Sequence, residues 1–232
     1  MQDKAKTFSI AIDGLAASGK STIAEALAKE LGVIYINTGL MYRAIGLYML
    51  RENVVDDPDA IAERMENVDI AVRFSDGKQR MYLFDDDVTD AIRALRVSIA
   101  TSKVSRVPQV REKMVALQRR IAEGQSVVMD GRDIGTMVLP DATLKIYLTA
   151  SAEVRARRRY EQLEAAFELP FNFDQVLEEI VRRDDLDTHR SVSPLRPAED
   201  SVLIDNTTMT LDETYALIKK LALEAINGGA DS

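Results

Sequence analysis

The sequence predicts an α/β fold in which a parallel β-sheet is flanked by helices. Short apolar runs alternate along the chain with longer stretches in which apolar residues recur at helical spacing. Several of these runs end in Asp or Gly, as buried strands do where they enter a loop. Strands that alternate with helices in this order form parallel sheets with right-handed crossovers.

The N-terminal part contains two strand–helix units. Phe8–Asp13 is apolar up to its final Asp and predicts a buried strand. Helical periodicity follows over Lys20–Leu31, and Gly32 marks its end. Val33–Ile36 predicts a second strand, and the apolar positions from Met41 to Met49 predict a second helix.

Residues 54–90 predict a small β insertion. Ile70–Phe74 and Arg80–Phe84 are rich in strand-forming residues, and Asp76-Gly77 lies between them. Asp-Gly between two such runs is a strong hairpin signal.

The remaining chain returns to the alternating pattern. Helical periodicity covers residues 90–123, with a break at Pro108, and then residues 151–164 and 174–188. Strands are predicted at residues 127–129, 144–148 and 202–204. Thr210 and Glu213 form a capping box ahead of a final helix.

Composition narrows the class of protein. The chain has 232 residues, a formal net charge of −8 and no Cys, which excludes disulfides, thiolate zinc sites and a cysteine nucleophile. Spanning a membrane takes about 20 consecutive apolar residues, and no stretch qualifies. The acidic balance argues against a nucleic-acid backbone as partner. We expect a cytoplasmic protein without membrane or nucleic-acid partners.

A glycine-rich segment joins the first strand to the first helix. Residues 14–21 read Gly-Leu-Ala-Ala-Ser-Gly-Lys-Ser and fit the pattern G-x-x-x-x-G-K-[ST]. Such a loop wraps phosphate oxygens with backbone N–H groups, and the helix N-terminus adds its dipole. We expect Lys20 to reach the β- and γ-phosphates and Ser21 to ligate Mg²⁺. The strand–turn–helix context disfavours a plain glycine turn, and the absence of Asn-Lys-x-Asp favours a small kinase over a GTPase.

A second set of polar residues follows strand and helix ends, where open α/β sheets bind ligands. Thr38 and Tyr42 are four residues apart and can face one pocket, or they can serve only as cap and core. Arg132 and Asp133 follow the third core strand, and an adjacent Arg and Asp suit a base that presents acceptors and donors.

Two further groups of charged residues are predicted to share helix faces. Arg183, Asp187 and Arg190 have the spacing of one face, as do Arg155, Arg158 and Arg159. The alternatives are a surface ion pair for the first group and a solvated basic face for the second. We expect His189 to be a bystander.

At these residues the chain resembles the bacterial cytidylate kinases, a family of P-loop nucleoside monophosphate kinases. The resemblance covers nearly the whole chain in the family's order. The matching segments are IAIDGLAASGKST, NTGLMYRA, SKVSRVPQVRE, VVMDGRDIGTMVLPDA, RRRYEQL and RRDDLDTHRSVSPLRPAEDSVLIDNT. Residue 37 departs from the family's usual Asp-[Ser/Thr]-Gly, because this chain has Asn37-Thr38-Gly39.

The resemblance implies one kinase domain over residues 1–232, with a monomer expected. It implies a P-loop core at about residues 7–36, 124–150 and 200–227, a monophosphate-binding region at about 37–106 that contains the β insertion, and a helical lid at about 155–192. It also implies ATP as donor with Mg²⁺, and CMP or dCMP as acceptor.

The resemblance further implies roles for individual residues. ATP would be bound by Gly14, Leu15, Ala16, Ala17, Ser18, Gly19, Lys20, Ser21 and Thr22, with Arg158 and Arg159 near the nucleotide. The acceptor would be bound by Thr38, Tyr42, Arg43, Ser102, Arg111, Arg132, Asp133 and Asp187, and by Arg183 and Arg190, which would touch both phosphates. Lys20, Arg132, Arg183 and Arg190 would supply the positive charge for transfer.

Three alternatives stay open at this point. A related small P-loop kinase would act on UMP, AMP or a non-nucleotide acceptor. A nucleotide-binding regulator would keep the fold and lack turnover, although an intact Lys20 and Ser21 argue against it. An RNA-linked role is weakened by the net charge of −8. Whether Asp130 reaches Mg²⁺ through water also stays open.

Overall fold

A five-stranded parallel β-sheet lies at the centre of the computed structural model, which describes residues 7–75, 77–165, 172–190 and 192–228. Its strand order is β2–β6–β1–β7–β8. The strands are β1 (Ser9–Gly14), β2 (Ile34–Asn37), β6 (Val127–Gly131), β7 (Leu144–Thr149) and β8 (Val202–Asp205). All five predicted core strands are therefore confirmed, with ends that differ by one or two residues.

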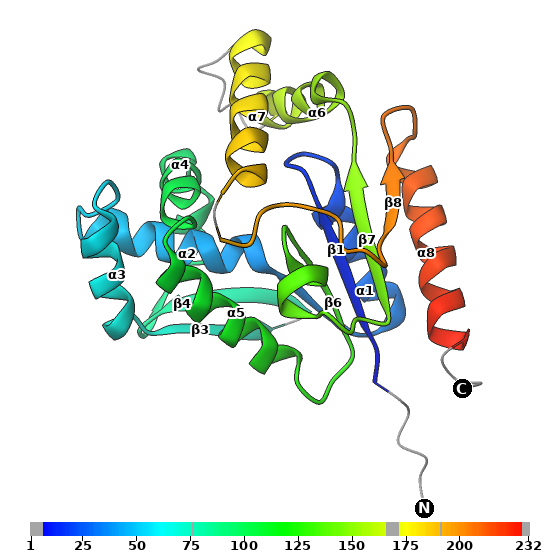
Figure 1. The fold of residues 1–232 in the computed structure, drawn as a ribbon, viewed down its shortest axis with the longest axis horizontal. Coiled ribbons are helices and arrows are strands. Elements are labelled where there is room, and N and C mark those ends of the chain that lie inside the picture. The colour runs from blue at the N-terminus through cyan, green and yellow to red at the C-terminus, as the bar shows by residue number, and fades with distance from the viewer. Residues whose placement is uncertain (1–6, 76, 166–171, 191, 229–232) are drawn as a thin grey trace, which may run out of the picture.

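Helices cover both faces of this sheet (Figure 1). The helices α1 (Lys20–Leu31) and α8 (Leu211–Gly228) pack on the face to which Ile10 and Ile12 of β1 point. The other face, which receives Ala11, is covered by α2 (Thr38–Arg51) and α5 (Pro108–Ala122). Burial on both faces explains why the strands read as nearly continuous apolar runs.

The predicted β insertion begins with a helix, so that expectation was wrong for its first part. Helix α3 (Pro58–Asn67) precedes the antiparallel strands β3 (Ile70–Ser75), β4 (Lys78–Leu83) and β5 (Asp86–Asp87). Asp57 caps α3 by accepting hydrogen bonds from the N–H groups of residues 59 and 60, and Pro58 occupies the first turn. This Asp-Pro pair is a helix-start signal.

The predicted helical stretch over residues 90–123 divides into a short 3₁₀ turn η1 (Ala91–Arg93), α4 (Leu95–Val104) and α5. Pro108 begins α5 because its missing N–H is harmless in a first turn. A π-helical turn, η2 (Ile134–Val138), follows β6.

Helices α6 (Ala152–Ala165) and α7 (Phe173–Thr188) pack against each other beyond the carboxyl ends of the strands (Figure 1). Tyr160 and Phe173 make an edge-to-face contact between them, with ring centroids 6.2 Å apart. Because α7 ends at Thr188, Arg190 lies beyond it, and the prediction that Arg190 shares a helical face with Arg183 was wrong.

The loops at the carboxyl ends of the strands meet at one edge of the sheet, the edge at which α/β folds bind ligands. In the described part of the chain, no helix is long and apolar enough to cross a membrane.

Candidate active site

The loop after β1 has the backbone that the phosphate-binding motif requires. Gly14 has φ 150°, and a Cβ atom there would lie 2.0 Å from the carbonyl oxygen of Leu148 on β7. Gly19 has φ 91° and immediately precedes α1. Both conformations favour glycine, so the loop stays narrow and its N–H groups stay available at the helix N-terminus.

Lys20 is held inside this loop. It is only 6% exposed, and its Nζ donates a 3.0 Å hydrogen bond to the carbonyl oxygen of Leu15. Burial, followed by the nearby guanidinium of Arg132, lowers the pKa of Lys20 to about 7. The buried Ser18 hydroxyl has no hydrogen-bond partner among the described residues. These polar groups fit a phosphate, which would supply the acceptors and the negative charge that they lack.

Ser21 of α1 begins a chain of side-chain hydrogen bonds that runs to β6 and then to β2. Its hydroxyl donates to Oδ2 of Asp130 at 2.7 Å. Tyr35 donates to Oδ1 of the same carboxylate at 2.8 Å and accepts from Nδ2 of Asn37 at 3.0 Å. Burial, together with the Asp130 carboxylate, raises the pKa of the Tyr35 hydroxyl above its ordinary range, so this hydroxyl keeps its proton.

The oxygens of Ser21 and Asp130 fit a Mg²⁺ ion. Mg²⁺ prefers oxygen ligands and usually takes only one or two from the protein, with water and substrate phosphates as the rest. The described residues contain no cluster of three or more Asp, Glu or His side chains that could hold a metal alone. Ser21 and Asp130 would therefore hold the ion together with water and substrate phosphates.

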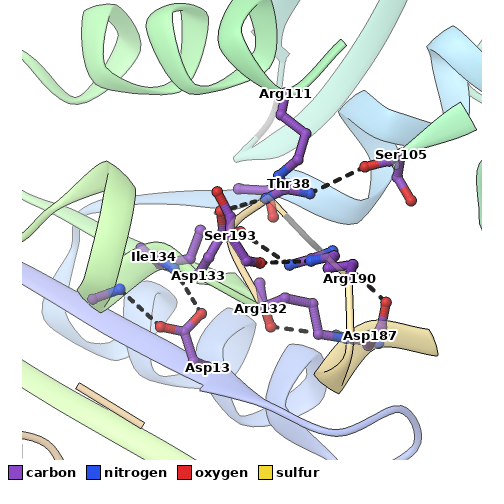
Figure 2. Close-up of polar contacts among 12 residues, drawn as sticks. Asp13, Thr38, Ser105, Arg111, Arg132, Asp133, Ile134, Asp187, Arg190 and Ser193 are labelled. Atoms are coloured by element: carbon purple, nitrogen blue, oxygen red, sulfur yellow. Dashed lines mark hydrogen bonds and ion pairs between the residues drawn. The ribbon is translucent and has the colours of Figure 1, made fainter. Parts of the chain in front are cut away.

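A second polar cluster combines the loop after β6 with the end of α7 and the segment beyond it (Figure 2). Arg132 Nε donates to Asp187 at 3.0 Å, and Arg190 lies 3.7 Å from Asp187 and 3.9 Å from Asp133. Asp133 also accepts from Arg111 of α5, and both side chains of this ion pair are almost fully buried. Burial opposes ionisation of Asp187, but Arg132, Arg183 and Arg190 outweigh it and hold its pKa below the usual value.

Some buried polar groups at this cluster have no hydrogen-bond partner among the described residues. The hydroxyl of Tyr42, Nε of Arg111 and Nη2 of Arg190 are buried without a hydrogen-bond partner in the described part of the chain. Burying such groups without partners costs free energy, and a ligand that forms hydrogen bonds with them removes this cost. The cluster is therefore prepared to bind a polar, anionic molecule.

Asp13 fixes the loop that carries Arg132 and Asp133. Its two carboxylate oxygens accept from the N–H groups of Ile134 at 2.8 Å and Gly135 at 2.7 Å (Figure 2). Burial raises the pKa of Asp13 to about 7 in spite of these two bonds. Asp13 thus joins the end of β1 to the start of η2, and it was not among the predicted site residues.

Arg155 and Asn206 contact the backbone of the phosphate loop, a role that was predicted for neither of them. Arg155 donates to the carbonyl oxygens of Ala150 at 2.8 Å and Ala16 at 3.3 Å, and it pairs with Asp184 of α7 at 2.7 Å. Its side chain is 3% exposed, so the solvated-face interpretation is wrong at this residue. Asn206 donates to the carbonyl oxygen of Ser18 at 3.0 Å.

The other predicted site residues differ in the hydrogen bonds that their side chains make. Arg158 donates to both oxygens of Asn206 at 3.1 Å, and Thr38 donates to the backbone carbonyl of Asp130 at 2.8 Å. Arg43 instead binds the carbonyl of residue 92 and the hydroxyl of residue 98. The structure assigns no side-chain hydrogen bond or ion pair to the described residues Thr22, Ser102, Arg159 and Arg183.

Arg183 is nevertheless close to the second cluster. Burial, followed by the guanidinium of Arg132, lowers its pKa to about 10. The exposed His189 contacts Asp185 alone, at 3.0 Å, among the described side chains, which agrees with a bystander.

Comparison with known proteins places these features in a family. The family model described as cytidylate kinase matches residues 10–224. A cytidylate kinase from Caldicellulosiruptor saccharolyticus is 47% identical over 95% of this chain and 98% of its own length. One from Caldanaerobacter subterraneus is 51% identical over 92% and 96%. An uncharacterized protein from Eubacterium ventriosum shares the fold, with a TM-score of 0.51 at 14% identity over 93% of this chain and 98% of that one. The chain belongs to the cytidylate kinase family.

Proposed function

We propose that this protein transfers the γ-phosphate of ATP to CMP or dCMP, giving ADP and CDP or dCDP. Membership of the cytidylate kinase family makes it a nucleoside monophosphate kinase. The observation that carries the proposal is the adjacency of two anion sites. Ser21, next to Lys20 in the phosphate loop, donates to Asp130 at 2.7 Å, and Arg132 of the second cluster follows Asp130 by two residues. A phosphate donor and a phosphorylated acceptor can therefore bind next to each other.

The charge of the second cluster supports a phosphorylated acceptor. Four guanidinium groups, those of Arg111, Arg132, Arg183 and Arg190, lie near two carboxylates, those of Asp133 and Asp187. The cluster therefore has an excess of two positive charges, which suits a phosphate dianion. The carboxylate of Asp133 can accept hydrogen bonds from a base, and the guanidinium of Arg111 beside it can donate them.

The reaction requires positioning and charge neutralisation more than proton transfer. The attacking atom is a phosphate oxygen that is already anionic near neutral pH, so no strong general base is needed. Phosphoryl transfer proceeds in line, and its developing charge is stabilised by fixed cations. Lys20, Arg132, Arg183 and Arg190 supply these cations from the chain. Mg²⁺, held at Ser21 with ATP, adds positive charge at the phosphates when bound.

We infer that residues 37–106 receive the acceptor and that α6 and α7, within residues 155–192, act as the lid. The lid assignment is supported by their position beyond the carboxyl ends of the strands (Figure 1) and by Arg155, which contacts both the phosphate loop and α7. Closure over the phosphates would exclude water, which competes with the acceptor as nucleophile.

Steady-state kinetics of Asp133→Ala test the acceptor site. We expect the KM for CMP to rise much more than the KM for ATP, at a temperature where the variant stays folded. An equal rise in both constants would contradict recognition of the acceptor at Asp133. Lys20→Ala is the contrasting variant, because it should reduce turnover with every acceptor.

A further inference from the structure

The hydrogen bonds that lead from Asn37 through Tyr35 to Asp130 each have a defined donor and acceptor. Oδ1 of Asn37 accepts from the N–H of Leu40 as the N-cap of α2, so its Nδ2 faces Tyr35. The Tyr35 hydroxyl accepts from that amide and donates its one proton to Asp130. Asn37 thereby orients the Tyr35 hydroxyl toward Asp130.

Asn37 itself is held in place by the antiparallel sheet. The side-chain amide of Gln79 on β4 accepts from the backbone N–H of Asn37 at 2.7 Å and donates to its carbonyl at 3.1 Å. Gln79 is buried, at 9% exposed. Both the backbone and the side chain of Asn37 are therefore held by hydrogen bonds.

Asp130 in turn orients Ser21. Its Oδ1 is occupied by Tyr35 and its Oδ2 by the Ser21 hydroxyl, while its own backbone carbonyl accepts from Thr38. The Ser21 proton is directed at Asp130, which leaves the lone pairs of the hydroxyl oxygen available to a cation. Asp130 is 2% exposed, so these bonds are shielded from water.

We propose that Tyr35, oriented by Asn37, is a positioning residue for the divalent metal: it holds the Asp130 carboxylate so that Ser21 presents its oxygen to the ion. The inference rests on the proposed function, in which Ser21 holds Mg²⁺ with ATP. Neither Tyr35 nor Asn37 touches the reacting atoms. Outer hydrogen-bond partners of metal ligands contribute about 10–100-fold to metal affinity.

The test measures Mn²⁺ binding by electron paramagnetic resonance in the presence of ADP, together with the Mg²⁺ dependence of turnover. For Tyr35→Phe we expect the Kd for Mn²⁺ and the half-saturating Mg²⁺ concentration to rise about tenfold, the low end of the outer-partner range. We expect kcat at saturating Mg²⁺ to stay within about twofold, because the fixed cations remain in place. Phe keeps the ring packing, so the variant folds.

Asn37→Ser is the second variant, because Ser also caps helices but is too short to reach the Tyr35 hydroxyl. It should raise the Mn²⁺ Kd less than Tyr35→Phe, and it should add nothing in the Tyr35→Phe background, since Asn37 acts through Tyr35. Tyr215→Phe is the matched control, as Tyr215 also donates to a carboxylate, that of Glu30, outside the site. It should leave the Mn²⁺ Kd unchanged.

The outcomes separate the two proposals. If the wild-type protein with ADP binds no Mn²⁺, the metal site at Ser21 fails and the positioning role fails with it. If the wild-type protein binds Mn²⁺ and Tyr35→Phe binds it equally well, the positioning role alone is overturned. A fall in thermal stability without any change in metal binding would also overturn the positioning role and leave Tyr35 a structural residue.

Discussion

Replacing Asp133 by Ala should destabilise the fold strongly, because it leaves the buried guanidinium of Arg111 without its counter-ion. The side chains of Asp133 and Arg111 are 5% and 3% exposed, and Arg190 lies 3.9 Å from the same carboxylate. Removing one partner of a buried ion pair costs about 3–5 kcal/mol. A protein of this size loses about 2–4 °C in Tm per kcal/mol, so we expect a fall of about 6–20 °C.

The assay is thermal and urea denaturation of the unliganded protein, followed by circular dichroism. Asp133→Asn keeps an acceptor oxygen but not the charge, so it should lose only about 1.5–3 kcal/mol, the contribution of a charged hydrogen bond. Asp86→Ala is the control, because the Arg51–Asp86 ion pair is 47% and 62% exposed and should be worth about 0–1 kcal/mol. A loss below about 1 kcal/mol for Asp133→Ala, equal to that of Asp86→Ala, would refute the reasoning.

Three other predictions concern the phosphates. At pH 8, the protein should take up close to one proton when it binds ATP, because the Lys20 amine of the free protein, with a pKa of about 7, is mostly neutral and the bound anion favours its protonation. The uptake should vanish near pH 6 and in Lys20→Met. Calorimetry in several buffers would detect it. Arg183→Ala should lower kcat about 10²–10³-fold with little change in Tm, since the side chain of Arg183 makes no hydrogen bond or ion pair in the described part of the chain. Full activity would remove it from the mechanism. Gly14→Ala should abolish ATP binding, because its Cβ would overlap the Leu148 carbonyl at 2.0 Å, and unchanged ATP affinity would contradict this.

The strands and the phosphate loop could be predicted because local signals specify them. Apolar runs ending in Asp13 and Asp130 mark strands that deliver polar groups to one edge of a parallel sheet. The helix α3 was missed although Asp57-Pro58 is a helix-start signal, because the nearby Asp76-Gly77 hairpin favoured strand for the whole segment. The start of α3 is therefore specified locally, by its capping residue and first-turn proline.

The supporting role of Arg155 could not be predicted, because it depends on contacts between distant segments. Arg155 has the spacing of a basic helix face, and its burial against Ala16 and Asp184 arises only when α6 packs over the phosphate loop. Asn206 had an available signal, since a polar residue after the last strand lies at the same sheet edge. Arg190 was misplaced because helical spacing continues in the sequence beyond Thr188, where α7 ends.

Transfer of phosphate to a cytosine nucleotide is tested most directly by ADP release from Mg·ATP, with CMP, dCMP, UMP, AMP or GMP as acceptor and with no acceptor. We predict strong turnover with CMP and dCMP only. Preference for another acceptor would keep the mechanism but contradict the base assignment at Arg111 and Asp133. A protein that binds ATP and turns over none of these acceptors would contradict the kinase function itself.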